Sequence, residues 1–277
     1  MFMRILSLGA GVQSSTLALM ATHGDIDPID CAIFADTGAE PKVVIEWLDW
    51  LETKVNFPIY RVTVGSLYDE SLTIRRIKTG KNAGKLCVPT KIPVFIANPD
   101  GSTGMFGRKC TSDYKIVAIE RQLKKILGIN RFNSKKPVRC EQLIGISVDE
   151  AQREKPSLRS EIRNVFPLLD LYMTRNDCFN WMEKHGYPEP PKSACTFCPF
   201  HSDAMWEDVK ASPEWGAVVH FERELQRLCK ADDITLGVPY LHRDCVPIDQ
   251  VEFKPKTNFK LHQLSLFGNE CSGLCGV

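Results

Sequence analysis

Short, continuous apolar runs alternate along this chain with stretches in which apolar residues recur every three or four positions. The first pattern is typical of buried strands, and the second of helices that bury one face. The predicted strands are residues 4–8, 31–35, 59–64, 143–147 and 165–169. The predicted helices are residues 15–23, 41–51, 111–127, 177–185, 204–211 and 214–230. This alternation predicts an α/β fold in which helices cover a parallel sheet of Rossmann-like type, followed by a helical C-terminal region.

The pattern is interrupted between Arg75 and Pro99, where glycines and prolines break up the sequence. This segment has no acidic residue, and its six basic residues are Arg75, Arg76, Lys78, Lys81, Lys85 and Lys91. It is either a solvated loop or a basic flap over a polyanionic substrate such as a nucleotide or nucleic acid. We therefore expect two regions. Residues 1–172 form a nucleotide-binding α/β domain with a basic insert at 75–109, and residues 173–277 form a helical, cysteine-bearing region.

Composition narrows the function classes. With 43% hydrophobic residues, 25% charged residues and a net charge of +1 over 277 residues, the chain is neither disordered nor a globally basic nucleic-acid binder. No signal peptide or membrane span stands near the N-terminus, so we expect a cytoplasmic location and no membrane partner. Eleven cysteines, an odd number, then indicate reduced thiols, a metal site or a catalytic cysteine rather than disulfides.

Two loops at predicted strand ends carry candidate ligand-binding residues. Glycines at 9 and 11 permit a sharp turn and close approach of an anion, and the helix that begins near Ser14 points free N–H groups at the same place. Taken alone, this run also fits an ordinary strand-to-helix connection. Asp36, Thr37 and Gly38 follow the second strand, at the same edge of the predicted sheet. The candidate nucleotide-binding residues are Ser7, Gly9, Gly11, Ser14, Ser15, Asp36, Thr37 and Gly38.

The cysteines suggest a metal centre. Cys195 and Cys198 form a C-x-x-C pair that can hold one metal, and Cys110 stands at a predicted helix start among basic residues, where a thiol pKa is lowered. These three thiols allow zinc, with His201 as a further ligand, or an iron–sulfur cluster. Four other cysteines lie in apolar periodic segments and are expected in the core: Cys31, Cys140, Cys178 and Cys229.

Two further cysteines, Cys271 and Cys275, stand in a glycine-containing C-terminal tail. The tail is either unanchored or carries a mobile nucleophile or an extra metal ligand.

Together, these motifs resemble those of a known family, the phosphoadenosine-phosphosulfate and adenosine-phosphosulfate reductases of the adenine-nucleotide alpha-hydrolase (PP-loop) superfamily. Residues 9–14 resemble the pyrophosphate loop S-G-G-K-D-S of that family, and residues 35–40 its D-T-G motif near the adenosine. Residues 108–115 are similar to the C-C-x-x-R-K segment, and residues 145–153 to a G-x-R…R segment that contacts the phosphosulfate. The pair at 195 and 198 falls where cluster-bearing members have C-x-x-C. The tail at 270–274 is similar to their E-C-G-L-H ending.

The resemblance implies a HUP-type, PP-loop core and a set of site residues. Cys110, Cys195 and Cys198 would hold a [4Fe–4S] cluster, with zinc as the alternative. Lys115 and Arg153 would bind the sulfate or phosphosulfate group, and Cys271 would be the nucleophile that attacks sulfur. The implied substrate is adenosine phosphosulfate or ATP, with Mg²⁺ left open. A thiol such as thioredoxin would be the reductant, and a homodimer is left open.

Several positions depart from the family pattern. Val12 and Gln13 replace the lysine and aspartate of the loop, and Lys109 replaces the first of two adjacent cysteines. The last change leaves three matching cluster ligands, so one iron would be open to sulfide or substrate. Two alternatives to phosphosulfate reduction follow. One is an ATP-dependent PP-loop sulfurtransferase that modifies a nucleic-acid base or small molecule, with the basic insert holding nucleic acid. The other is a catalytically inactive nucleotide- or metal-binding partner protein.

Overall fold

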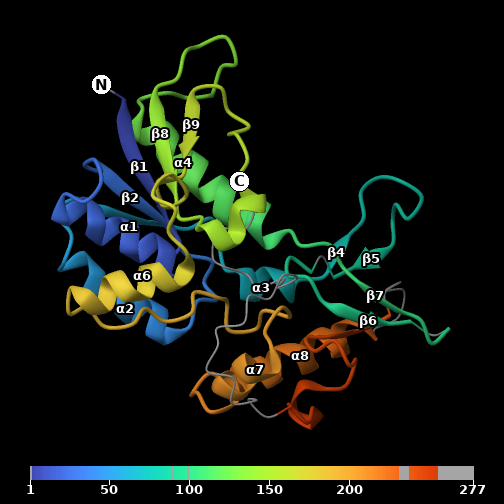
Figure 1. Ribbon diagram of the computed structural model, residues 1–277. Coiled ribbons are helices and arrows are strands. Elements are labelled where there is room, and N and C mark those ends of the chain that lie inside the picture. The colour runs from blue at the N-terminus through green and yellow to red at the C-terminus, as the bar shows by residue number, and fades with distance from the viewer. Residues whose placement is uncertain (1, 89, 99, 231–236, 255–277) are drawn as a thin grey trace.

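A computed structural model describes residues 2–88, 90–98, 100–230 and 237–254. Its central element is a five-stranded, fully parallel sheet in the order β3-β2-β1-β8-β9 (Figure 1). The strands are β1 (Met3–Leu8), β2 (Cys31–Ala35), β3 (Ile59–Val62), β8 (Cys140–Ile144) and β9 (Ile162–Val165). The predicted α/β fold with a parallel sheet is therefore confirmed. The chain builds the sheet outward from β1 to β3 and then returns to the other side of β1, so the strand order reverses between β1 and β8.

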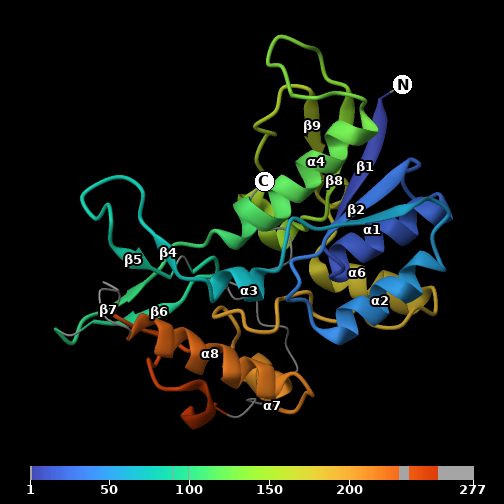
Figure 2. The same cartoon turned by 180° about the vertical axis from the view of Figure 1, so that it is seen from behind.

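Helices cover both faces of this sheet, because alternate residues of each strand point to opposite sides. Leu6 and Leu8 of β1 join a core with α1 (Val12–His23), α2 (Lys42–Glu52) and α6 (Arg175–Lys184). Ile5 joins a second core with α4 (Val117–Ile126), which crosses the opposite face (Figure 2). With apolar cores on both sides, every residue of β2 and β8 is buried.

Helix ends follow local sequence signals. Gly24 ends α1 with φ of 84°, the left-handed conformation expected of a glycine C-cap. Thr174 and Asp177 form a reciprocal capping box at the start of α6. Helix α1 begins at Val12, three residues before the predicted start. A π-helical segment, Thr111–Ile116, precedes α4 within the predicted helix 111–127.

One predicted strand is wrong and another is shifted. At 165–169 the chain leaves β9 at Val165 and forms the short helix α5 (Pro167–Asp170), with proline in the first turn, where its missing N–H costs nothing. The predicted strand 143–147 instead spans Cys140–Ile144. It ends before Gly145, where an added Cβ would lie 2.9 Å from the backbone nitrogen of Ser14.

The basic insert contains regular structure that its sequence did not predict. Strands β4 (Arg75–Arg76) and β5 (Leu86–Cys87) form a hairpin after the short helix α3 (Leu67–Ser71). Strands β6 (Phe95–Ala97) and β7 (Thr103–Met105) then join β10 (Val238–Tyr240) in an antiparallel sheet in the order β10-β6-β7. The insert and the C-terminal segment thus share one sheet. They also share one core with α7 (Asp203–Lys210) and α8 (Trp215–Cys229).

A 3₁₀ segment, Val148–Arg153, follows β8, and another, Ile248–Gln250, follows β10. Within the described ranges, no helix combines the length and apolar character needed to cross a membrane.

Candidate functional site

The loop between β1 and α1 is a tight turn that presents the start of a helix. Ala10 has φ of 58°, in the left-handed region, between the two glycines. The Gly9 N–H donates to Ser14 Oγ at 3.2 Å, and the Ser14 hydroxyl donates to the Gly11 carbonyl at 3.3 Å. No side chain in the described part of the chain caps α1, so its first N–H groups and the positive end of its dipole remain available to an anion.

Two serines beside this loop have different surroundings. Ser7, in β1, is 1% exposed, and its hydroxyl has no hydrogen-bond partner among the described residues. A buried hydroxyl without a partner is costly, so Ser7 is a good candidate to contact a bound group. Ser15 accepts a hydrogen bond from the indole N–H of Trp47 at 3.0 Å, deep in the helix–sheet core. The structure therefore gives Ser15 a role in packing α2 against α1.

The loops after β1 and β8 meet where the strand order reverses. Gln13 Nε2 donates to Ser147 Oγ at 3.3 Å and to Glu150 Oε2 at 3.2 Å, which joins α1 to the segment after β8. Arg153 donates to the same carboxylate oxygen at 2.8 Å. In open parallel sheets, ligands bind outside the carboxyl ends of the strands at such a reversal. Gln13 thus holds a neighbouring carboxylate in place.

The loop after β2 is also closely constrained. The Gly38 N–H donates to Asp36 Oδ1 at 2.7 Å, and Gly38 has φ of 69°. A side chain at Gly38 would approach Cα of Ser66 to 3.2 Å. The Thr37 carbonyl accepts from the Leu67 N–H at 2.8 Å, which ties α3 to this loop. Thr37 itself is fully buried, so this loop offers a fixed backbone at the carboxyl edge of the sheet.

A thiol lies against this second loop. Thr37 Oγ1 lies 3.6 Å from Cys195 Sγ, and Glu40 Oε1 lies 3.9 Å from the same sulfur. Thr37 also donates to Glu40 Oε1 at 3.1 Å, and Lys115 Nζ lies 3.9 Å from that oxygen. The side chains of Glu40 and Lys115 are only 3% and 12% exposed, so this charge pair is largely desolvated.

Backbone hydrogen bonds hold the cysteine loop in place. The Thr196 N–H donates to the Ala39 carbonyl at 2.9 Å, and the Cys198 N–H donates to the Cys195 carbonyl at 3.0 Å. The C-x-x-C turn of the C-terminal segment is therefore anchored on the loop that follows β2. Sequence analysis did not select Glu40. Its position two residues after the D-T-G run was the available signal.

The three predicted metal ligands, Cys110, Cys195 and Cys198, belong to one apolar cluster. Across residues 2–88, 90–98, 100–230 and 237–254, no three His, Cys, Asp or Glu side chains are arranged to hold a metal ion. Cys271, the predicted nucleophile, and Cys275 lie outside the described residues. The metal centre and the nucleophile therefore stay predictions.

The remaining cysteines and His201 have buried environments. The four cysteines expected in the core are all buried. Burial raises the pKa of the Cys178 thiol to about 12 and those of Cys31, Cys140 and Cys229 to about 11, so these thiols are unreactive. Burial and the charge of Lys192 lower the pKa of His201 to about 4, which keeps its ring neutral.

No protein-family model matches the chain, and no curated protein matches its sequence. Among solved structures, the chain is similar to the phosphoadenylyl-sulfate (PAPS) reductase from Candida auris in its phosphate complex. The TM-score is 0.40 at 12% sequence identity, over 68% of this chain and 74% of the other. The α/β fold described above rests on the order and register of this chain's own strands.

Proposed function

We propose that this protein is an adenine-nucleotide-dependent enzyme of sulfur chemistry, with phosphosulfate reduction as its reaction. The observation that carries the proposal is the 3.6 Å approach of Cys195 Sγ to Thr37 Oγ1. It brings a thiol to the edge of the sheet where both candidate nucleotide loops lie. The same sulfur lies 3.9 Å from the Glu40 carboxylate, which pairs with Lys115; these two side chains are 3% and 12% exposed.

Different residues would bind the phosphate and the adenosine. The start of α1, with Gly9, Gly11 and Ser14, would bind phosphate through backbone N–H groups and the helix dipole. Asp36 and Gly38 would contact the adenosine. Because a lysine and an aspartate are replaced at positions 12 and 13, the loop relies on the backbone for anion binding. If Mg²⁺ accompanies the nucleotide, Glu150 is a carboxylate in reach of this loop, since it accepts from Gln13.

In phosphosulfate reduction, the Cys271 thiolate would attack the sulfur of the bound nucleotide. The S–O bond to the phosphate breaks, the adenosine phosphate leaves with its electron pair, and a cysteine thiosulfonate forms. A dithiol reductant of the thioredoxin class then attacks Cys271 Sγ, so that sulfite leaves with the electron pair of the S–S bond. The second thiol of the reductant then attacks the resulting mixed disulfide and releases the Cys271 thiolate, so the dithiol is oxidised to a disulfide as the sulfate sulfur is reduced by two electrons. Lys115 and Arg153 would bind the sulfate or phosphosulfate group.

A [4Fe–4S] cluster, or zinc, on Cys110, Cys195 and Cys198 would supply positive charge beside the nucleotide. The shared apolar cluster favours this assignment, but the described residues do not form a complete ligand set. The reaction above therefore contains no step through the metal. Iron, acid-labile sulfide and zinc should be measured per chain after anaerobic purification, with Cys195→Ala as the comparison.

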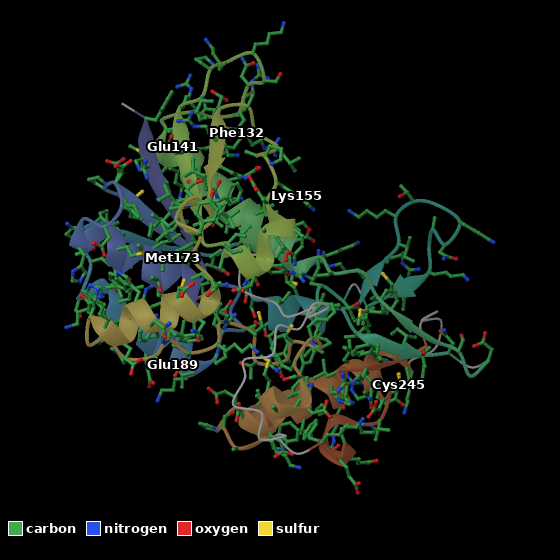
Figure 3. The ribbon with its side chains drawn as sticks, in the orientation of Figure 1. Phe132, Glu141, Lys155, Met173, Glu189 and Cys245 are labelled. Carbon is green, nitrogen blue, oxygen red and sulfur yellow. The ribbon has the colours of Figure 1, made fainter. Side chains whose placement is uncertain are left out.

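The deciding experiment is sulfite release from adenosine phosphosulfate and from its 3′-phosphorylated form, with thioredoxin or dithiothreitol as reductant. We expect activity that Cys195→Ser lowers and Cys245→Ser leaves unchanged. Cys245 is a matched control because it is a half-buried cysteine in the C-terminal segment (Figure 3). No sulfite from either substrate would refute phosphosulfate reduction.

A second candidate is an ATP-dependent sulfurtransferase that modifies nucleic acid. In that reaction ATP adenylylates a carbonyl oxygen of a base, pyrophosphate leaves, and a sulfur nucleophile displaces AMP. The exposed basic hairpin of the insert favours this candidate. Pyrophosphate released only in the presence of RNA or DNA would support it, and nucleotide binding without either activity would favour the inactive partner protein.

A further inference from the structure

The β4–β5 hairpin, residues 75–87, projects from the molecule (Figure 1). Its backbone is closed by hydrogen bonds from Ile77 N–H to the Lys85 carbonyl, at 2.9 Å, and from Gly84 N–H to the Ile77 carbonyl, at 2.8 Å. Gly80 and Gly84 have φ of 86° and 90°, and a Cβ at either would meet no atom within 4 Å. Residues 78–85 are all exposed. The hairpin has a defined shape but contributes little to the core, so its sequence is free to serve another purpose.

All charged residues of the hairpin are basic. Residues 75–87 contain five basic residues and no acidic or aromatic residue. Arg75 pairs with Glu70 at 3.3 Å, and Arg76 donates to the Gly84 carbonyl. No carboxylate in the described ranges pairs with Lys78, Lys81 or Lys85, which stand together on the exposed loop. Like charges on one short loop repel one another, and a polyanion would relieve that repulsion.

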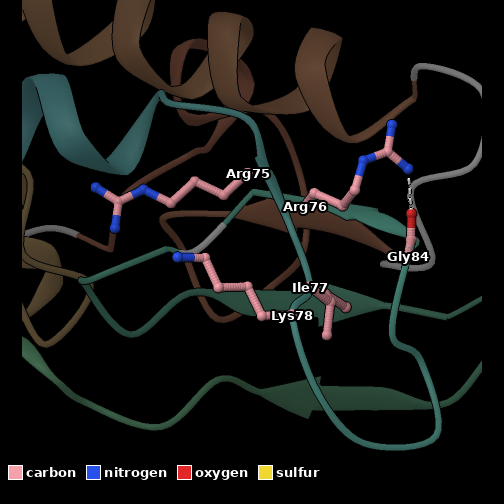
Figure 4. Close-up of a pocket in the computed structure, with 5 residues that line it drawn as sticks. All are labelled: Arg75, Arg76, Ile77, Lys78 and Gly84. Carbon is pink, nitrogen blue, oxygen red and sulfur yellow. Dashed lines mark hydrogen bonds between the residues drawn. The ribbon is translucent and has the colours of Figure 1, made fainter.

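The base of the hairpin borders an open hollow. This hollow of about 790 Å³ is lined by Arg75, Arg76, Ile77, Lys78 and Gly84 (Figure 4). The side chains of Arg75 and Lys78 extend toward the same side of the hairpin, while Arg76 extends to the other side (Figure 4). Cations on both sides of a narrow arm can contact successive phosphates of a backbone, whereas one small anion needs a single converging site.

The arm is connected to the candidate nucleotide site. Helix α3 leads into it, and the Leu67 N–H at the start of α3 bonds to the Thr37 carbonyl at 2.8 Å. Glu70, on the same helix, pairs with Arg75 at the base of the arm. A second acid-free basic stretch, residues 121–139, leads instead into the amino end of β8, where Phe132 lies (Figure 3). The two differ in their connection: Arg121, Lys124 and Lys125 border the end of β3 beside Val62 and Thr63, whereas the arm follows α3, which is bonded to the D-T-G loop.

We propose that this hairpin is a nucleic-acid-binding arm whose lysines and arginines contact the phosphodiester backbone without reading the base sequence. Residues 75–87 contain no aromatic side chain, which argues against base stacking. Proteins that bind single strands combine such stacking with a positively charged groove. The lack of aromatic side chains also argues against membrane insertion, which relies on exposed aromatic and aliphatic side chains. The proposal deepens the second candidate function, which also uses this hairpin, but it does not depend on whether the bound nucleotide is reduced or activated.

The test is the salt dependence of binding of a labelled hairpin RNA, a single-stranded DNA and a duplex DNA to the full chain. The variant K81Q/K85Q removes two positive charges from the arm. The matched control K54Q/K184Q removes two from exposed lysines after α2 and at the end of α6. Each lost phosphate contact lowers the slope of log K against log salt concentration by roughly 0.7–0.9. The arm variant loses two such contacts, so it should bind roughly 25- to 60-fold more weakly in 0.1 M salt. The control should match the wild type.

The three nucleic acids identify which backbone is bound. The proposal is overturned if the wild type binds none of them at low salt, if both variants lose affinity equally, or if only phosphatidylserine vesicles bind. Nucleotide affinity, measured calorimetrically on the same variants, should be unchanged. This separates failure of the arm from failure of the proposed function, which would appear as absent nucleotide binding in the wild type.

Discussion

Replacing Gly145 by alanine should separate the two loops that meet at the strand reversal. An added Cβ would lie 2.9 Å from the backbone nitrogen of Ser14, 3.1 Å from its Cα and 3.1 Å from the carbonyl carbon of Gln13. All three neighbours are at the start of α1, where no flexible side-chain end can move aside. The helix start must therefore shift by several tenths of an ångström, at about 1–3 kcal/mol, the usual cost of overpacking.

This shift should affect both stability and ligand binding. At about 2–4 °C per kcal/mol, thermal unfolding should begin several degrees lower. The displaced helix start should also bind adenine nucleotide at least tenfold more weakly, since an anion there depends on the position of backbone N–H groups. Differential scanning fluorimetry and isothermal titration calorimetry measure the two effects.

Gly216→Ala is the matched control, because Gly216 lies in α8 and a Cβ there meets no atom within 4 Å. That change should leave nucleotide affinity unaltered and, within a helix, raise stability slightly. If Gly145→Ala bound nucleotide with wild-type affinity and unfolded at the wild-type temperature, the close contact between these loops would be refuted as the basis of the site.

Three further changes test buried and capping contacts in the fold. Burial raises the pKa of Glu222 from 4.5 to about 7, so ionising this carboxyl group destabilises the folded state. The free energy of unfolding should therefore fall as the pH rises from 4.5 to about 7. In denaturant titrations, Glu222→Gln should reduce this dependence on pH. Thr174→Ala removes the capping box with Asp177 and should cost about 1 kcal/mol of stability by chemical denaturation, with no change in nucleotide affinity. Ser15→Ala leaves the buried indole of Trp47 without an acceptor and should cost about 1–3 kcal/mol; a loss of nucleotide affinity without a loss of stability would instead show that this hydroxyl contacts ligand.

The sequence predicted the parallel sheet because its strands are continuous apolar runs, which burial on both faces requires. It failed at 165–169, where an apolar run fits either element and Pro167 decides for a helix. Strands of two or three residues, such as β4 and β6, are too short to produce a periodic signal. They form through pairing with distant partners.

In the candidate site, too, the sequence predicts the local features but not the long-range contacts. The glycine loop and the D-T-G loop are local patterns, and their residues lie at strand ends as expected. The bridge from Gln13 to Glu150 and the approach of Cys195 to Thr37 join positions more than a hundred residues apart. Such contacts depend on the strand order and on how the C-terminal segment docks, neither of which the residue pattern contains.

The pairing of β6 with β10 has a consequence for synthesis on the ribosome. Phe95–Ala97 forms the centre of its sheet only after Val238–Tyr240 has been made, roughly 140 residues later in the chain. At about 5–20 residues per second, one edge of β6 waits on the order of 10–30 s without its partner. During that interval the nascent chain carries an open strand edge, which is a template for pairing with other chains. Termination shortly before Val238 should therefore give a product that aggregates, even though all five strands of the parallel sheet are complete by Val165.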